Sequence, residues 1–485
     1  MTSMSELTFL WHDYETFGKN TRSARPAQFA GIRTDLDLNE IGAPIEVFCR
    51  PAPDFLPEPE ACLITGITPQ VCLDKGVAEC EFAAQIERAL AQPNTIGVGY
   101  NTIRYDDEIT RFMFWRNLIE PYAREWQNGC GRWDLIDLAR VTHALRPEGI
   151  VWPKNADGNT SFKLTDLTEA NGIAHESAHD AVSDVRATIA LARLIKERQP
   201  KLFEFYFKLR SKHAVSDEIG LHLSEPKPFL HLSSMYPAAR GHLALVYPLG
   251  AHPSNANEVI VWDCSADPSV LFGLDAATVR ERMFTRADAL PDGVARLPIK
   301  TIHLNKSPVV IGNLKVLNDD AATRCGLDLN AALANAQTLA QYRGANDLTA
   351  LWREVFQRTF DEVADVDEAL YSGFVGNGDR RLLNQLKAMK PTELANARTS
   401  FVDERLEELV FRYRARNFPE SLSADEQSIW AAHCVEKLHN GTASSLSLDD
   451  FFAQLEQLSD GADAHGVAVI EALYEYAYSI ASDDE

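Results

Sequence analysis

The stretch Leu7-Thr8-Phe9-Leu10-Trp11-His12-Asp13-Tyr14-Glu15-Thr16 places two carboxylates directly after an apolar and aromatic run. Residues 7–11 have the composition of a buried strand. Because side chains two residues apart on a strand point to the same face, we expect Asp13 and Glu15 on one face of a sheet. Two neighbouring carboxylates repel each other and are costly near a core unless a cation neutralises them. The pair therefore predicts a site for Mg²⁺ or Mn²⁺, which prefer oxygen ligands.

The Asp-x-Glu spacing is a weak signal by itself. The chain holds 70 acidic residues among 485, and it repeats the spacing in Asp106-Asp107-Glu108 and Asp483-Asp484-Glu485. The alternative interpretation is a polar end of a strand. Further carboxylates placed near the same sheet are needed before the pair indicates a functional site.

A second candidate segment follows a glycine-containing strand expected at residues 95–100, which leads through Asn101 into a helix that begins near Asp106. A carboxylate at the start of a helix can also serve only as a capping or first-turn acid. Asp106 is the better ligand candidate because it follows the aromatic Tyr105, which can anchor the turn. Chemistry alone leaves Asp107 open as a substitute.

The third segment joins His179 to Asp184, five residues later, across a loop-to-helix junction. His175 and Asp180 have the same spacing, so spacing does not choose between the pairs. The helical pattern does, since Asp184 lies within the apolar run formed by Val182, Val185, Ile189 and Ala192. An acid on that face is better explained as a ligand than as a solvated charge. For His179 the alternative is a surface or hydrogen-bonded histidine.

The charge balance limits the kinds of partner. Lys plus Arg number 47 against 70 acids, and the net charge of −23 excludes a general basic coat for nucleic acid. Eight cysteines contain no C-x-x-C pair, so we expect free thiols in a reducing cytoplasm. The first seven residues do not have the pattern of a signal peptide, and no apolar stretch approaches the ~18 residues of a membrane helix.

Three blocks are expected along the chain. Residues 7–199 form an α/β domain with a mixed sheet, with strands at 7–11, 28–34, 45–50 and 95–100 and helices at 82–91, from 107, at 135–145 and at 181–196. Residues 200–346 are rich in short strands, expected at 229–232, 243–247, 258–262 and 308–311. Residues 347–485 are almost entirely helical in pattern.

The order Asp-x-Glu, Asp, His-x-x-x-x-Asp resembles the DEDD exonucleases, in the branch that carries histidine. The surrounding segments resemble the bacterial exonuclease I family over the whole chain: residues 12–18 (HDYETFG), 25–30 (RPAQFA), 63–70 (LITGITPQ), 144–150 (ALRPEGI) and 413–419 (YRARNFP). The resemblance implies an RNase H-like exonuclease domain, a small β-rich SH3-like domain and an α-helical C-terminal domain. It also implies degradation of single-stranded DNA from the 3′ end to 5′-mononucleotides, processive action, and a role in DNA repair and recombination.

The family motif falls on Asp13, Glu15, Asp106, His179 and Asp184, with no departure from the pattern. We expect two Mg²⁺ ions about 3.5–4 Å apart, or Mn²⁺ as a substitute, to clamp the attacking and leaving oxygens. Asp13 would bridge the ions, Glu15 and Asp184 would complete the site of the nucleophilic water, and Asp106 would support the second ion. His179 would act as general base on that water.

The resemblance also suggests contacts outside the metal site. Contacts to the terminal nucleotide are expected from Thr16 and Phe17, from Leu63, Gly66 and Ile67 in a loop at residues 63–68, and from Asn101. The alternative for that loop is a plain turn with core side chains. Arg146 is a candidate contact for the acidic tail of single-stranded DNA-binding protein, with a structural salt bridge as the alternative. A monomer is expected.

Residues 196–212 hold six basic and two acidic residues, interleaved with Phe203, Phe205, Tyr206 and Phe207. Such a segment suits a single strand, whose bases stack and whose phosphates pair. The alternative is an amphipathic helix that packs its aromatic residues into the core. The alternating Arg412, Arg414 and Arg416 pose the same choice between a strand path and a structural or solvated cluster.

Two other functions remain open at this stage. An exoribonuclease would use the same site, because a few contacts distinguish the 2′-hydroxyl. A non-catalytic module that binds DNA or a partner would retain the fold without the reaction, and the intact acids and histidine argue against it.

Overall fold

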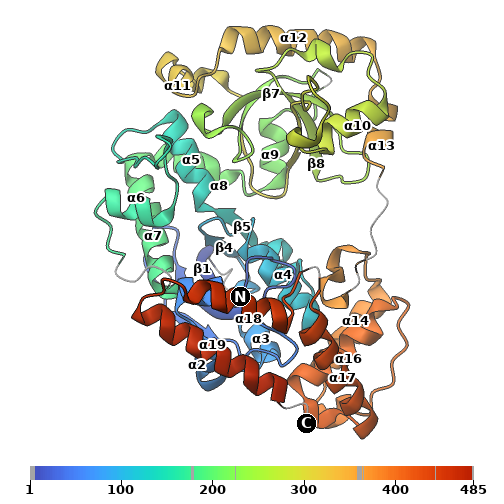
Figure 1. Ribbon diagram of the computed structural model, residues 1–485. Coiled ribbons are helices and arrows are strands. Elements are labelled where there is room, and N and C mark those ends of the chain that lie inside the picture. The colour runs from blue at the N-terminus through green and yellow to red at the C-terminus, as the bar shows by residue number, and fades with distance from the viewer. Residues whose placement is uncertain are drawn as a thin grey trace, which may run out of the picture. The chain divides into compact units, whose positions relative to one another are not determined.

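The computed structural model describes residues 6–175, 180–223, 225–357, 363, 365–442 and 444–482. The chain divides into two compact units (Figure 1). The first contains Met1–Gly131, His175–Ile189 and Phe360–Glu485, and the second contains Arg132–Ala174 and Ala190–Thr359. Residues from both ends of the chain therefore build the first unit.

The sheet of the first unit places β1 (Thr8–Thr16) between β2 (Pro26–Thr34) and β4 (Thr95–Gly99), with β3 (Ile45–Phe48) beyond β2. Strands β1, β2 and β3 pair antiparallel, whereas β1 and β4 run parallel, so the expected mixed sheet is confirmed. Strand β1 extends five residues beyond the predicted end at Trp11. The two carboxylates consequently lie within a paired strand.

Short and long helices pack against this sheet. They are α1 (Pro59–Thr65), α2 (Pro69–Lys75), α3 (Glu79–Leu90), α4 (Asp106–Arg116) and the beginning of α7 (Ala181–Arg198). A buried cluster joins the sheet to α3 and α4 through side chains that include Leu10, Tyr14, Phe29, Phe82 and Met113. This packing holds the start of α4 against the middle of β1.

The C-terminal segment of the first unit is helical, as predicted. It contains η7 (Val366–Tyr371), α14 (Asn377–Ala388), α15 (Pro391–Leu394), α16 (Arg405–Asn417), η8 (Pro419–Ser421), α17 (Ala424–Asn440), α18 (Leu448–Ser459) and α19 (Ala464–Ser482). In Figure 1, α19 lies beside α2 (red against blue), and an apolar cluster joins α18 and α19 to Phe17, Cys62 and Cys72. A second cluster packs Trp115 of α4 against Leu406 and Leu409 of α16. The helical segment thus shares its core with the sheet domain.

The second unit contains an antiparallel five-stranded sheet in the order β10-β6-β7-β8-β9. Its strands are β6 (Phe229–Leu232), β7 (Leu243–Ala251), β8 (Glu258–Asp263), β9 (Ile299–His303) and β10 (Val309–Ile311). Four of the five match predicted strands, and β9 was not predicted. The β-rich character expected for this part of the chain is confirmed.

The remaining elements of the second unit are mostly helices. They are α5 (Leu135–Leu145), α6 (Leu164–Ala170), α8 (Pro200–Lys208), α9 (Lys212–Glu218), α10 (Ala276–Phe284), α11 (Asp319–Arg324), α12 (Leu329–Ala345) and α13 (Thr349–Val355). Strand β5 (Gly131–Asp134) begins where the chain passes from the first unit to the second. Short 3-10 turns η1 to η6 complete both units at Ala123–Glu125, Gln127–Gly129, Ala238–Arg240, Pro268–Leu271, Ala287–Ala289 and Leu314–Val316.

The aromatic residues of helix α8 pack inward rather than forming a surface for bases. The ring centroids of Phe203 and Tyr206 lie 5.1 and 5.4 Å from that of Trp133, and all three side chains are buried. Phe207 adds a third ring 5.4 Å from Trp133. The interpretation of residues 196–212 as a stacking platform for a strand is therefore wrong at these positions, and the alternative of an amphipathic helix is confirmed.

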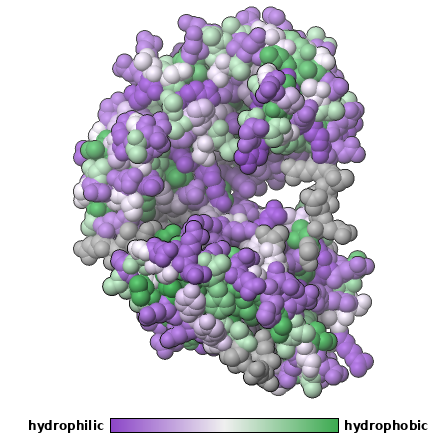
Figure 2. Space-filling model, in the orientation of Figure 1, coloured by the Kyte–Doolittle hydropathy of each residue, from purple (hydrophilic) through white to green (hydrophobic). Residues whose placement is uncertain are grey.

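All eight cysteines are free thiols, as expected. Among the described residues, no helix combines the length and the apolar character needed to cross a membrane. The face drawn in Figure 2 is largely hydrophilic, with apolar residues in small groups.

Candidate active site

Three carboxylates meet at the centre of the first unit. Asp13 and Glu15 lie on β1, opposite Ala30 and Gln28 of β2, and Asp184 lies in the first turn of α7. One ligand oxygen from each acid lies within 4.8 Å of the others. The structure thus brings Asp13 and Glu15, which were predicted to share one face of a strand, together with Asp184, which was predicted to face the core.

Asp106 adjoins this group from the first residue of helix α4. Its Oδ1 accepts a hydrogen bond of 3.1 Å from the backbone N–H of Tyr14, the residue between Asp13 and Glu15. The Tyr14 hydroxyl lies 3.0 Å from Thr110 Oγ1, which in turn donates to the backbone carbonyl of Asp106. Asp106 is thus fixed to β1 by its own side chain and by the first turn of its helix.

Burial and mutual repulsion raise the pKa values of these acids. Loss of hydration is the larger cause for Asp13, followed by the charge of Asp184, and together they raise its pKa to about 8. Burial, then Asp13 and Asp184, raise the pKa of Glu15 to about 9. The pKa of Asp106 is also raised, first by burial and then by Asp13. Burial and mutual repulsion therefore disfavour the charged forms of these acids in the protein alone.

A divalent cation fits this donor set. The ligand atoms are all carboxylate oxygens, the class that Mg²⁺ and Mn²⁺ prefer. Bound cations supply the positive charge that would let the acids remain ionised at neutral pH. The residues present are thus suited to one or more such ions.

Asp107 is occupied elsewhere. Its Oδ1 forms a buried ion pair of 2.5 Å with Arg124 Nη2, and both side chains are at most 3% exposed. The geometry favours Asp106 over Asp107 as the ligand, since the Asp106 carboxylate contacts β1 while Asp107 pairs with Arg124.

His179 lies outside the described residues, so its position relative to the acids stays a prediction. In the alternative pair, Asp180 Oδ2 accepts a hydrogen bond of 3.0 Å from the N–H of Ser183 at the start of α7. His175, by contrast, contacts the site directly: its Nε2 is bonded to Asp184 Oδ1. The sequence offered no signal for that contact, since His175 and Asp184 lie nine residues apart and the five-residue spacing relates His175 to Asp180.

Residues Thr16 and Phe17, the predicted contacts that follow the acids, differ in their surroundings. The Thr16 hydroxyl donates to the carbonyl of Gly18 at 2.8 Å and lies 2.6 Å from the hydroxyl of Tyr105. Phe17 is 1% exposed and belongs to the apolar cluster under α18 and α19. Its backbone is engaged as well, since its N–H donates to the carbonyl of Arg25 at 2.9 Å and its carbonyl accepts from the N–H of Glu58 at 2.7 Å.

The segment expected as a loop at residues 63–68 is partly helical, which corrects that prediction. Leu63 lies in α1, which ends at Thr65, and Gly66 follows at φ 69° as its left-handed cap. Ile67 is buried, while Leu63 is half-buried. Asn101 lies between β4 and α4 and also has a positive φ, of 68°. A left-handed conformation is uncommon at a non-glycine residue, which indicates that the turn before Asp106 is held in a specific, constrained backbone conformation.

The predicted partner contact Arg146 lies in the second unit, directly after α5. Its Nη1 donates to the carbonyls of Leu145 at 2.6 Å and Val316 at 3.1 Å. These two bonds give the Arg146 guanidinium a structural role through backbone carbonyls.

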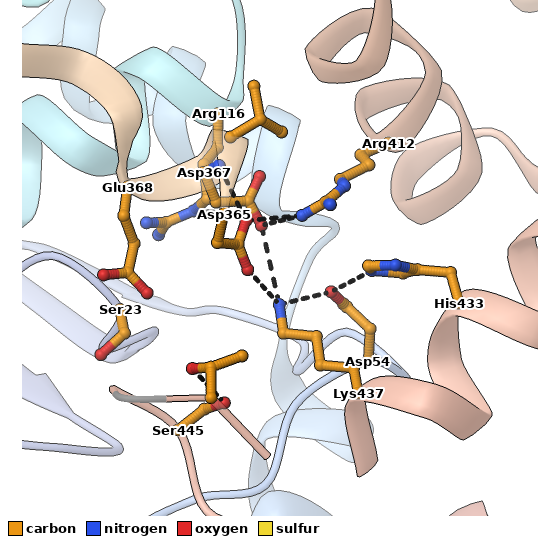
Figure 3. A network of polar contacts seen from close by, with 12 residues as sticks. Ser23, Asp54, Arg116, Asp365, Asp367, Glu368, Arg412, His433, Lys437 and Ser445 are labelled. Atoms are coloured by element: carbon orange, nitrogen blue, oxygen red, sulfur yellow. Dashed lines mark hydrogen bonds and ion pairs between the residues drawn. The ribbon is translucent and has the colours of Figure 1, made fainter. Parts of the chain in front are cut away.

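The arginines of α16 form ion pairs rather than a path for a strand. Arg416 and Arg412 bind the acids Asp54, Asp365 and Asp367, and Arg414 binds Glu426. Figure 3 shows Lys437 between Asp54 on one side and Asp365, which precedes η7, and Asp367 of η7 on the other. The structural alternative for these arginines is confirmed.

Comparison with family models gives three matches along the chain. The exonuclease model matches residues 10–192, the exonuclease I SH3-like domain matches 210–358, and the exonuclease I C-terminal domain matches 364–480. These matches confirm the expected fold class: a mixed α/β exonuclease domain, an SH3-like domain and a helical C-terminal region.

Whole-chain relatives agree with these matches. Exodeoxyribonuclease I of Escherichia coli is 43% identical over 478 residues, which is 98% of each chain. A crystal structure of E. coli exonuclease I in complex with a dA16 oligonucleotide has a TM-score of 0.91 at 43% identity, covering 98% of this chain and 100% of the other. A structure of SSB/exonuclease I in complex with an inhibitor has a TM-score of 0.88 at 42% identity, again covering 98% and 100%.

Proposed function

The chain belongs to the exodeoxyribonuclease I family of exonucleases, and from this premise we propose that it degrades single-stranded DNA from the 3′ end. In this proposal it releases 5′-mononucleotides with Mg²⁺, acts processively, and serves DNA repair and recombination in the cytoplasm. The observation that carries the proposal is the meeting of Asp13, Glu15 and Asp184 within 4.8 Å. The oligonucleotide bound to the E. coli relative supports the substrate class.

Asp13, Glu15, Asp106 and Asp184 would hold two divalent ions, with Asp13 between them. Such ions, when bound, activate a water as nucleophile and stabilise the leaving oxygen of an in-line displacement. The protein's part is to orient the carboxylates, and the Tyr14 N–H does so for Asp106. His179 is proposed to accept the proton of the nucleophilic water on a ring nitrogen, since histidine titrates near neutral pH.

The terminal nucleotide is proposed to contact the surface around Thr16, Phe17, Leu63, Gly66, Ile67 and Asn101. Gly66 offers backbone without a side chain, in a left-handed turn where any Cβ would be strained. A Cβ there would also approach His465 Nε2 at 3.3 Å. We propose that the backbone at Gly66 approaches the last base of the DNA closely, because no side chain lies between them.

The acidic tail of single-stranded DNA-binding protein is the proposed partner, with Arg146 as one contact. The structure of a relative with SSB supports this proposal. We further propose that the protein is a monomer, and that its functional domains span residues 7–199, 200–346 and 347–485, close to the segments that the family models match.

The test is degradation of 3′-labelled and 5′-labelled single-stranded DNA, beside RNA of the same sequence, in Mg²⁺. The proposal expects early release of the 3′ label as a mononucleotide, little action on RNA, and loss of activity in Asp13→Asn and on chelation. Asp74→Asn, an exposed acid on α2 of the same unit, serves as the matched control and should retain activity. Preference for RNA would overturn the substrate, and no cleavage of either polymer would leave only a binding module.

A further inference from the structure

We propose that Tyr105 is a positioning residue whose hydroxyl fixes the distance between Glu15 and Asp106. The inference rests on the proposed function, because it concerns the same carboxylate site. Tyr105 directly precedes Asp106, and Thr16 directly follows Glu15. A bond between Tyr105 and Thr16 therefore ties together the two segments that carry these acids.

Three oxygen atoms form the connection, which we call the hydroxyl latch. The Tyr105 and Thr16 hydroxyl oxygens each lie 2.8 Å from the backbone carbonyl oxygen of Gly18. Because each hydroxyl carries a single proton, one of them donates to this carbonyl while the other donates to its neighbouring hydroxyl. The two hydroxyl oxygens lie 2.6 Å apart. Residues 16 and 18 belong to the end of β1 and the turn that follows it, whereas Tyr105 belongs to the turn before α4, so the latch spans 87 to 89 residues of sequence.

The latch lies where regular backbone bonding weakens. The register between β1 and β2 shifts between Glu15 and Thr16, so the ladder is irregular immediately after the second acid. Tyr105 is the N-cap residue of α4, with φ −124° and ψ −72°, and its side chain makes no capping bond to the helix. The end of β1 therefore lacks a regular β-ladder, and the start of α4 lacks a side-chain capping bond.

The latch complements the bond that Tyr14 makes to Asp106. Tyr14 N–H binds the Asp106 carboxylate from one side of β1, while Thr16, two residues on, holds the turn that leads into Asp106. With both in place, the first residue of α4 is attached to the strand before and after Glu15. Partners that orient a metal-binding carboxylate without touching the metal typically change metal affinity 10–100-fold when removed.

The test measures Mn²⁺ binding without DNA, by the electron paramagnetic resonance signal of free Mn²⁺. Tyr105→Phe removes only the hydroxyl and should weaken Mn²⁺ binding about tenfold. Tyr476→Phe is the matched control, because this buried tyrosine in the same unit also donates to a backbone carbonyl, that of Phe55 at 3.3 Å. It should bind Mn²⁺ as the wild type does.

A double-mutant cycle separates the latch from a general loss of stability. Thr16→Val should weaken Mn²⁺ binding as well, and its combination with Tyr105→Phe should add little, since both remove one connection. The Mg²⁺ concentration for half-maximal nuclease rate should rise in both variants while the KM for DNA stays unchanged in Tyr105→Phe.

The outcomes distinguish the inference from its premise. If Tyr105→Phe binds Mn²⁺ like the wild type, or if the two substitutions are fully additive, the latch is overturned and the proposed function stands. If the wild-type chain binds no Mn²⁺ at all, the proposed metal-dependent function is overturned, and the inference with it.

Discussion

Arg416 of helix α16 binds Asp54, a residue 362 positions earlier in the chain, through two hydrogen bonds of 2.6 and 3.0 Å. Both side chains are almost completely buried, at 3% and 0% exposure. Arg416 also pairs with Asp367 of η7 at 2.5 Å. One guanidinium thus joins the loop after β3, the turn η7 and helix α16, and it attaches the C-terminal helices to the sheet domain.

Arg416→Ala should therefore destabilise the first unit strongly. Removing one partner leaves Asp54 and Asp367 buried with less compensating charge, a change that costs about 3–5 kcal/mol. Urea unfolding followed by circular dichroism measures the free energy of unfolding. Lys19→Ala, which breaks the exposed pair with Glu60, is the control and should change stability little. An equal effect of the two substitutions would contradict a stabilising role for the buried network.

The same acids predict the response to pH. Burial alone would raise the pKa values of Asp54 and Asp367, but Arg416 and other cations, Lys437 among them, outweigh it and hold both pKa values well below the usual range. The folded state then binds fewer protons than the unfolded state in the acid range. The contribution of these acids is fully present above the unfolded pKa of about 4 and is lost as pH falls through the lower folded pKa.

The free energy of unfolding of the wild type should therefore fall steeply below about pH 4. Asp367→Asn should be less stable at pH 7 but should lose less on further acidification, because one of the titrating acids is absent. Urea midpoints at pH 7, 5, 4 and 3.5 provide the comparison. Parallel pH curves for variant and wild type would show that Asp367 does not contribute in this way.

The carboxylate site was predictable because its signals are local. Period-two geometry requires Asp13 and Glu15 to share a face once the strand continues through them, and β1 does continue to Thr16. The helical pattern around Asp184 is likewise carried by a few neighbouring residues. The sequence left open whether Asp106 or Asp107 is the ligand, and the ion pair of Asp107 with Arg124, 17 residues away, favours Asp106.

The buried ionic network was not predictable, because its members are distant in sequence: Arg416 lies 49 residues from Asp367 and 362 residues from Asp54. No local pattern distinguishes Arg416 bound to Asp54 from an arginine that lines a groove. Two short helices were missed for a different reason. Both α1 and α2 begin at a proline, Pro59 and Pro69, which reads as a loop residue although it is tolerated in the first turn.

Helix α8 allows the packing of its aromatic residues to be tested. Phe203→Ala should lower the free energy of unfolding of the second unit by about 3–5 kcal/mol, because it opens a cavity beside Trp133 and Tyr206. Urea unfolding followed by tryptophan fluorescence measures the change, with Glu204→Ala on the exposed face of the same helix as control. A large loss of affinity for single-stranded DNA at unchanged stability would instead restore the stacking interpretation.

Arg146→Ala should reduce the stimulation of DNA degradation by single-stranded DNA-binding protein. The substitution removes a positive charge that the acidic tail would pair with, and it also removes the bonds to the carbonyls of Leu145 and Val316. The readout is the ratio of the stimulated to the unstimulated rate. Arg286→Ala, at an exposed arginine of the same unit, is the control. An unchanged ratio would remove Arg146 from the contact surface.

Mg²⁺ should stabilise the wild type, and Asp13→Asn should abolish the effect. A ligand that binds only the folded state adds about 2.7 kcal/mol when its concentration is 100 times its Kd, so the melting temperature should rise with added Mg²⁺. In the absence of Mg²⁺, Asp13→Asn should melt no lower than the wild type, because it relieves repulsion within the group formed with Glu15 and Asp184. Differential scanning calorimetry with and without Mg²⁺ measures both effects, and Asp74→Asn should keep the wild-type response. If Asp13→Asn melts at a lower temperature than the wild type without Mg²⁺, and Mg²⁺ then raises its melting temperature as much as that of the wild type, the cation does not bind at Asp13.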